Sequence, residues 1–294
     1  MKRFFQLLLV TGEDAGSFLQ GQLTQDVDRL PAAVSLPTAW CNPKGRVLCV
    51  ARMLEIDGGI GLVIPGELLD PVVKRLSIYR LRAKVTFGIP ETDWRCLAVA
   101  AEEDLAALAA LNLLPQRTRN ATRRAGGVVT VDTGAARRCI EAYGTATAIE
   151  HVGLRIVHPL PDPEWQKALI DAGIPTIVTA TSEQYTPHML NLDCLGAVSF
   201  SKGCYTGQEI VARTEHLGNS KRRLMHYRLD AGSAKIGDKL TFEQREVGDI
   251  INIVDRDLLA VVPLNLHDQT LTLKGHPAHP VALPYPLPSP TGDA

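Results

Sequence analysis

Ten consecutive residues, FSKGCYTGQE at positions 200–209, hold the strongest candidates for chemistry in this chain. The thiol of Cys204 lies between Gly203 and Gly207, with the amine of Lys202 two positions before it and the carboxylate of Glu209 five positions after it. A cysteine acts as a nucleophile or a metal ligand only as the thiolate. The surroundings of Cys204 therefore decide what this residue can do.

The residues that follow Cys204 predict a turn and then a helix. Thr206 and Glu209 match a T-x-x-E capping box, and Gly218 is placed to end the helix. Cys204 would then lie near a helix N-terminus, where unpaired amide groups and the helix dipole favour negative charge. Lys202 would add a second positive influence. Both features favour a thiolate.

The same residues also fit a capped turn with an incidental cysteine, because capping boxes are common and lone cysteines are often structural. Three histidines, His151, His188 and His216, are candidates for a Cys–His pair, but nothing in the sequence places any of them beside Cys204. The local pattern alone leaves a working thiol and a simple turn as alternatives.

Other parts of the motif have structural uses. Gly203 and Gly207 would let a ligand or another strand approach the backbone closely. Glu209 and Arg213 are four residues apart on the predicted helix, so their side chains could form an ion pair on one face.

A second glycine-centred turn, CNPKGRVL at 41–48, carries Lys44 and Arg46. Arginine forms a planar fork that suits a carboxylate or phosphate, but an ordinary N-P-K-G hairpin turn with solvated charges explains the same residues. Two further basic runs, at 117–124 and 221–223, are typical of solvated faces. The net charge of −1 argues against nucleic acid as a direct high-affinity ligand.

The six cysteines are scattered and form no C-x-x-C pair, so we expect reduced thiols, no disulfide framework and no resident metal site. The opening MKRFFQLLLV predicts a first β-strand rather than a signal peptide, since its apolar stretch is short and interrupted by Gln6. No run approaches the roughly 18 apolar residues of a membrane span. These features predict a cytoplasmic protein without membrane association.

Helical and strand-like segments alternate up to about residue 220, which predicts an α/β or α+β body. Helix signals include Asp14 before SFLQGQLTQDV, the Asp70-Pro71 and Asp162-Pro163 pairs, and the acidic start of EEDLAALAALNLL. Thr186-Pro187 predicts a further short helix ended by Gly196.

After Lys221 only short strands remain, which predicts a small β-barrel or sandwich. We therefore expect a body over 1–220, a barrel over 221–284 and a proline-rich tail over 285–294. The tail is expected to be disordered or tethered to the surface.

FSKGCYTGQEIVAR closely resembles the signature K-G-C-Y-x-G-Q-E of the YgfZ family, whose members are relatives of the glycine-cleavage T-protein. Further segments occur in the family's order: FLQGQLTQDV, CNPKGRVL, RLSIYRLRAKV, GIPTI, PHMLNLDCLGAVSF and GNSKRRL. The resemblance covers nearly the full chain and is least distinctive in the middle and in the C-terminal tail.

This resemblance implies a T-protein-like α+β fold, in which two intertwined α/β units and a C-terminal β-barrel surround a central channel suited to tetrahydrofolate. Family members are implicated in maintaining particular iron–sulfur enzymes, including radical enzymes that thiolate tRNA, in a folate-dependent way. The family's motif cysteine lies near the channel, and that role carries over to Cys204. By the same resemblance Lys202 is a candidate catalytic residue beside Cys204. The other motif residues carry over as folate-binding or motif positions: Gly203, Tyr205, Gly207, Gln208, Glu209 and Arg213.

By resemblance we expect a monomer that binds tetrahydrofolate or a derivative and works with iron–sulfur client or assembly proteins. Cys204 would be a reactive thiol or a transient ligand of an iron–sulfur cluster. One cysteine cannot hold a cluster alone, so a partner would supply the other ligands.

The chain departs from the T-protein at Ser201, where a true aminomethyltransferase would present an acidic residue. This departure argues against classical aminomethyl transfer. It leaves folate binding open, because Lys44 and Arg46 could meet the glutamyl carboxylates. Three hypotheses remain: a folate-binding accessory protein for iron–sulfur enzymes, a folate-dependent aminomethyltransferase, and a non-catalytic scaffold that binds tRNA or protein.

Overall fold

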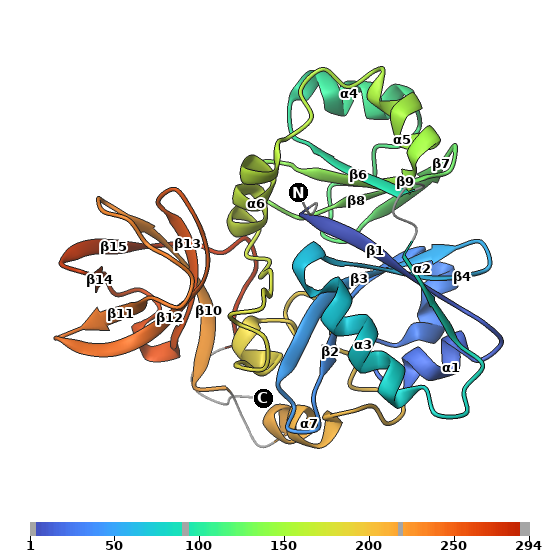
Figure 1. Cartoon of the computed structure of the whole chain (residues 1–294). Coiled ribbons are helices and arrows are strands. Elements are labelled where there is room, and N and C mark those ends of the chain that lie inside the picture. The colour runs from blue at the N-terminus through green and yellow to red at the C-terminus, as the bar shows by residue number, and fades with distance from the viewer. Residues whose placement is uncertain (1–3, 90–93, 217–219, 289–294) are drawn as a thin grey trace.

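The computed structural model describes residues 4–89, 94–216 and 220–288. These residues form two open sheets with their helices and a C-terminal barrel (Figure 1). The first sheet has the strand order β2-β3-β4-β1-β5, and each hydrogen-bonded pair is antiparallel. Its strands are β1 (Phe5–Thr11), β2 (Ser35–Cys41), β3 (Val47–Ile56), β4 (Gly59–Pro65) and β5 (Thr86–Gly88). The first strand confirms that residues 5–11 of the apolar opening form a β-strand.

Helices close the first sheet on one side. They are α1 (Ala15–Gln20), the 3-10 turn η1 (Val27–Arg29), α2 (Leu30–Ala33), η2 (Gly66–Leu68) and α3 (Leu69–Tyr79). The predicted capping carboxylates of α1 and α3 do not cap these helices. Asp14 occupies the N-cap position of α1, but its carboxylate accepts a hydrogen bond from the amide of Lys84 and makes no cap hydrogen bond. Asp70 lies inside the first turn of α3, because η2 already starts the helical path.

The second sheet, in the order β6-β9-β8-β7, is also antiparallel. Its strands are β6 (Trp94–Val99), β7 (Thr122–Ala125), β8 (Val128–Asp132) and β9 (Ile140–Thr145). The helices α4 (Glu102–Ala110) and α5 (Ala146–Gly153) pack on it, and α6 (Asp162–Asp171) lies between this sheet and the barrel (Figure 1). The predicted cap at Asp162 is wrong, because α6 begins at Asp162 itself and its N-cap residue is Pro161, with no side-chain cap hydrogen bond. Pro163 is within the first turn of α6, and Gly173 follows the helix in the left-handed region, as the sequence predicted.

After α6 the chain returns to the first sheet and packs on it, which makes the two α/β units intertwined. Ile177, Tyr185, Leu190 and Val211 belong to the same apolar core as the strands of the first sheet. The helix predicted after Thr186 is a single 3-10 turn, η3 (His188–Leu190), because Asn191 adopts a left-handed conformation directly after it. The last helix, α7 (Gln208–His216), lies beside the β2–β3 hairpin (Figure 1).

The C-terminal strands close into a six-stranded antiparallel barrel in the order β10-β13-β12-β11-β14-β15. The barrel contains β10 (Arg222–Leu229), β11 (Lys239–Phe242), β12 (Arg245–Val254), β13 (Asp257–Pro263), the turn η4 (Leu264–Leu266), β14 (Leu271–Leu273) and β15 (His276–Val281). It has its own apolar core, while Leu224, Ile251, Leu259 and Val261 face the body. The α+β class with a C-terminal barrel is confirmed.

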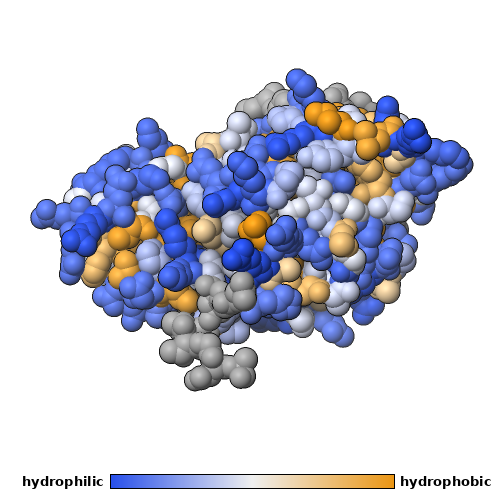
Figure 2. Space-filling view, turned by 90° about the horizontal axis from the view of Figure 1, so that it is seen from below, coloured by the Kyte–Doolittle hydropathy of each residue, from blue (hydrophilic) through white to orange (hydrophobic). Residues whose placement is uncertain are grey.

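The boundaries proposed at 220 and 284 remain predictions. Within the described residues, no helix combines the length and apolarity that crossing a membrane requires. On the face shown in Figure 2, hydrophilic residues predominate and apolar ones form small separate patches.

Candidate functional site

Cys204 is the exposed cysteine among the six, and it lies in the irregular loop that leads to α7. The helix α7 starts at Gln208, so Cys204 lies four residues before its first residue and not directly at its N-terminus. Gly203 is also exposed, and a Cβ atom built on it would meet nothing within 4 Å. The thiol is therefore presented in open space.

The loop that carries Cys204 is fixed to a second loop, residues 20–25, which follows α1. The amide of Thr206 donates to the carbonyl of Gly21 at 3.1 Å, and the amide of Ser199 donates to the carbonyl of Thr24 at 2.9 Å. In return, the Thr24 hydroxyl donates to the carbonyl of Ala197 at 2.7 Å. These two loops belong to FLQGQLTQDV and FSKGCYTGQE, and we call their contact the motif frame.

Lys202 is the centre of the motif frame. Its Nζ donates to the carbonyl oxygens of Gln20, Leu23 and Gln25, at 2.7, 2.8 and 3.0 Å. An ammonium group has three donors and no acceptor, so these bonds use its full capacity. Only 9% of the residue is exposed, and burial lowers the pKa of Lys202 to about 8. The sequence predicted that this amine would favour the thiolate of Cys204. These contacts do not support that prediction, since all three hydrogen bonds of the amine go to residues 20–25.

Tyr205 is buried beneath the same amine, with Nζ of Lys202 at 5.2 Å from the ring centroid. This distance suits a cation–π contact. Burial raises the pKa of Tyr205, so the phenol stays neutral. Lys202 and Tyr205, two motif residues near Cys204, are therefore held by contacts within the protein.

The turn of CNPKGRVL packs directly against the motif. Gly207 has φ +83° and lies so close to Asn42 that a Cβ atom would clash with the Asn42 carbonyl oxygen. A Cβ on Gly45 would meet the side chain of Ile210 at 2.8 Å. The expectation that Gly207 permits a close approach is therefore confirmed, and the approaching segment is the β2–β3 turn.

The two cations of that turn differ. Nη1 of Arg46 donates to the carbonyl of Gln184 at 2.8 Å, so its guanidinium holds a neighbouring loop. Lys44 is exposed, and its side chain makes no hydrogen bond or ion pair within the described ranges. Lys44 is consequently the better placed of the two for an anionic group from solvent.

The predicted capping box does not form. Because α7 starts at Gln208, Thr206 lies too early to cap it, and its hydroxyl donates to Oε1 of Gln22 at 3.5 Å. Glu209 and Arg213 are both exposed, and neither has an ion-pair partner in the part of the chain that the structure describes. Gly218, the predicted end of the helix, lies outside the described residues.

Of the three histidines considered, His151 and His216 are exposed and His188 is buried. Nε2 of His188 lies 2.9 Å from Oε2 of Glu215, at the far end of α7 from Cys204. Nearby, Arg223 forms a buried ion pair with Asp193 at 2.7 Å, so the prediction of a solvated face is wrong for Arg223. His188, Asp193 and Glu215 lie close enough to suggest a metal cluster, but Arg223 already neutralises Asp193.

A buried carboxylate that the sequence did not single out lies where the two sheets meet. Glu141 accepts from Nε1 of Trp165 at 2.9 Å and from the Tyr143 hydroxyl at 2.6 Å, and Nε of Arg52 lies 3.8 Å away. Glu141, Tyr143 and Arg52 border a cavity of about 60 Å³ that is lined by both sheets and by α6. A second cavity, of about 50 Å³, lies between α6 and the barrel and shares Leu169, Ile174 and Thr176 with the first.

The start of the proline-rich tail returns to the body, so residues 285–288 are placed and not disordered. The Tyr285 hydroxyl donates to the carbonyl of Gly173 at 2.8 Å and accepts from Nδ2 of Asn191 at 3.2 Å. The guanidinium of Arg119 stacks on the ring at 5.0 Å. The prediction of a solvated face is therefore also wrong for Arg119.

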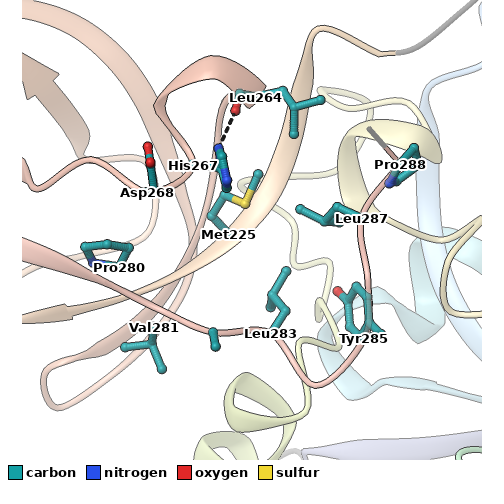
Figure 3. A pocket seen from close by; sticks show the side chains of 11 residues that line it. Met225, Leu264, His267, Asp268, Pro280, Val281, Leu283, Tyr285, Leu287 and Pro288 are labelled. Carbon is teal, nitrogen blue, oxygen red and sulfur yellow. Dashed lines mark hydrogen bonds between the residues drawn. The ribbon is translucent and has the colours of Figure 1, made fainter. Parts of the chain in front are cut away.

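Tyr285 also borders an apolar groove with a volume of about 480 Å³ (Figure 3). Met225 and Pro280 of the barrel line one wall, while Leu283 and Leu287 come from the segment that leaves the barrel. His267 and Asp268 are exposed residues at its margin. No local pattern in the sequence predicts this groove, because its walls meet only after the barrel closes.

Comparison with solved structures defines the fold class. The chain superposes on the glycine cleavage system aminomethyltransferase T from Bartonella henselae with a TM-score of 0.67, covering 96% of this chain and 84% of that one at 15% identity. The protein therefore has the aminomethyltransferase fold.

Sequence relatives identify the family. The chain is 34% identical over 231 residues to the tRNA-modifying protein YgfZ of Shigella dysenteriae serotype 1, covering 78% of this chain and 70% of that protein. It is 29% identical over 260 residues to an uncharacterized protein of Haemophilus influenzae, covering 86% of this chain and 83% of that protein. No family model matches the chain. The chain belongs to the YgfZ family.

Proposed function

We propose that this protein is a folate-binding accessory factor that supports the assembly or repair of iron–sulfur enzymes, including enzymes that modify tRNA, through the thiol of Cys204. The observation that carries the proposal is the exposure of Cys204 on the rigid motif frame. A thiol held on a fixed loop and open to solvent can reach a partner protein. The YgfZ relatives are named tRNA-modifying proteins, which supports the link to tRNA modification.

Tetrahydrofolate is the ligand that the fold supports best, since the structural neighbour is an aminomethyltransferase of the glycine cleavage system. The cavity beside Glu141 is lined by a carboxylate and a guanidinium that have protein partners in this structure: Glu141 accepts from Trp165 and Tyr143, and Arg52 donates to Ser35 and Asn120. Ligand binding would exchange some of these partners for N–H donors and carbonyl acceptors of the ligand. The carboxylate and the guanidinium suit a ring that carries both amino and carbonyl groups. We propose that Glu141 and Arg52 hold the ring, and that Lys44 remains available to an exposed carboxylate.

The chemistry of this donor set fits a folate, but the volume does not fit without movement. Sites for small molecules usually have volumes of about 300–1,000 Å³, whereas the two cavities at this junction measure about 60 and 50 Å³. Binding would therefore require the junction to widen. The role of Cys204 does not depend on this step, because the thiol already faces solvent.

Calorimetric titration of tetrahydrofolate tests the ligand. We expect binding by the wild type, a loss of at least about tenfold in affinity for Glu141→Gln, which equals about 1.4 kcal/mol, and no change for Cys204→Ala. Glu150→Gln, at an exposed position on α5, is the matched control. Wild-type protein that does not bind reduced folates would refute the folate assignment.

A reconstituted tRNA-thiolating iron–sulfur enzyme tests the thiol. We expect Cys204→Ala to fold normally and to lose its support of that enzyme, while Cys194→Ala, at a half-buried cysteine, retains it. Full support by Cys204→Ala would exclude a working thiol. We expect no turnover of an aminomethylated carrier protein, and turnover would instead favour an aminomethyltransferase. Tight tRNA binding at physiological salt without folate binding would favour a scaffold.

A further inference from the structure

The two small cavities are positioned along one continuous interface. On one side of it lie the second sheet and α6, represented by Glu141, Tyr143 and Leu169. On the other side lie the first sheet and the barrel, represented by Ala51 and Asn252. We call this interface the seam.

Side-chain charges make several of the contacts that cross the seam. Nζ of Lys167 on α6 lies 2.8 Å from Oδ2 of Asp257 in the barrel. Nη1 of Arg124 lies 2.9 Å from Oε2 of Glu55, joining the second sheet to the first. Polar groups of this kind can exchange their partners for water when an interface opens, so these contacts do not prevent separation.

Apolar contacts keep the two sides attached elsewhere on the same interface. Leu7, Leu54 and Val63 of the first sheet pack against Val129 and Val131 of the second. Close packing of this type resists separation, because opening it exposes apolar surface to water. The seam thus combines a packed region with a region of voids and charges.

We propose that the second sheet and α6 move together as one body, and that the seam opens at its cavities to form a ligand chamber while the Lys167–Asp257 pair favours the closed state. Interfaces that pack well on both sides do not usually contain adjoining voids. The two cavities, joined at Leu169, Ile174 and Thr176, mark the part of the seam where a small displacement creates the most space. The ligand named for this chamber rests on the proposed function, whereas the opening itself does not.

Cysteine labelling tests the opening without any ligand. Ala51 lines the first cavity and is 8% exposed, so the variant Ala51→Cys places a thiol inside the closed seam. Cys41 and Cys49 are buried in the core of the first sheet and report global unfolding in the same molecule. Labelling with iodoacetamide, followed by mass spectrometry of each site, measures the three rates together.

We expect the thiol of Ala51→Cys to react at least tenfold faster than Cys41 and Cys49. Adding Lys167→Met should increase its rate further, because the contact with Asp257 is lost. The matched control, Lys239→Met, removes an ion pair within the barrel and should leave the rate unchanged. Equal labelling of all three sites, with no effect of Lys167→Met, would overturn the proposal.

Tetrahydrofolate then separates this inference from the proposed function. Saturating tetrahydrofolate should slow labelling of Ala51→Cys if the ligand occupies the chamber. Fast labelling without any tetrahydrofolate effect would support the opening and count against the folate assignment. Slow labelling together with tight binding of tetrahydrofolate would count against the opening and support the folate assignment.

Discussion

The motif frame and the seam both bury polar groups, but they do so in opposite ways. In the frame, Lys202 donates to three backbone carbonyls, and Gly207 meets the neighbouring turn without space for a side chain. In the seam, Glu141 and Lys167 contact other charged side chains beside cavities. Backbone hydrogen bonds in a closed space fix one arrangement, whereas side-chain pairs beside voids permit a second one.

Two lysines show the same contrast in their ionisation. Burial lowers the pKa of Lys202 to about 8, and the opposing influence of the Asp26 and Asp28 carboxylates does not outweigh it. Burial also opposes the charge of Lys167, but hydrogen bonds and charges from Asp257 and Asp171 outweigh it and raise its pKa. The frame therefore holds its cation against a desolvation cost, while the seam compensates its cation with carboxylates.

The largest expected effect comes from adding one methyl group to the frame. In Gly207→Ala the Cβ atom would clash with the carbonyl oxygen of Asn42, at a backbone φ of +83° that alanine adopts with strain. We expect a loss of about 4 kcal/mol in the free energy of unfolding, in the range of the most disruptive single substitutions. Urea denaturation followed by circular dichroism measures it.

Gly203→Ala is the matched control, because the same methyl group would meet nothing within 4 Å. We expect it to change stability by no more than about 0.5 kcal/mol. Equal losses in the two variants would mean that the motif loop and the β2–β3 turn are not in close contact.

Lys202→Met should have the second largest effect. The substitution leaves three carbonyl oxygens without their donor, and a buried group left without a partner costs about 1–3 kcal/mol. Removing a buried charge offsets part of this cost, so we expect a net loss of about 2–3 kcal/mol. The same denaturation experiment on Lys44→Met, at an exposed lysine, should show a change within about 0.5 kcal/mol. A stability equal to the wild type would show that the frame does not need the lysine.

Much of the fold could be predicted from local patterns. The change from mixed helices and strands to strands alone after about residue 220 was predicted, and β10 begins at Arg222, because short apolar or alternating runs between turn residues specify strands directly. The last barrel strand, HPAHPV, carries no such local signal, since its prolines and histidines have low strand propensity and its pairing with β10 and β14 decides its conformation.

The site was predictable in part. The motif residues and the turn at 42–46 were both singled out, but their contact depends on glycines whose close packing no local pattern reveals. Lys202 seemed a partner for the thiol because it is near in sequence, whereas its amine contacts a loop about 180 residues earlier. Glu141 and Tyr285 lacked any motif, and only long-range packing brings Glu141 to Trp165 and Tyr285 to Gly173.

A smaller effect concerns the barrel side of the seam and depends on pH. His226 is buried beside Asp257, Asp171 and Lys167, and burial lowers its pKa below 6.5. The unfolded chain therefore binds a proton more readily than the folded one. The contribution to stability is complete above pH 6.5 and is lost as the pH falls through the folded pKa.

Thermal unfolding should accordingly show a lower Tm at pH 5.5 than at pH 7.5, and His226→Gln should reduce this difference. His276→Gln, at an exposed histidine, should retain the full dependence. A pH dependence that is the same in all three proteins would show that another group is responsible.

The smallest effect expected, at the Arg124–Glu55 pair, is also the sharpest test of the contrast. Both side chains are more than one-third exposed, and exposed ion pairs contribute about 0–1 kcal/mol. A double-mutant cycle with Arg124→Met and Glu55→Gln should give a coupling energy of about 0.5 kcal/mol that decreases when the salt concentration rises from about 0.1 to 1 M, because the screening length shortens from about 10 to 3 Å. If the coupling energy exceeds about 2 kcal/mol and is independent of salt, this pair holds the seam closed nearly as firmly as Lys202 holds the frame. The opening proposed for the seam would then require breaking a strong contact, and the distinction between a fixed site for the thiol and a movable site for the ligand would be lost.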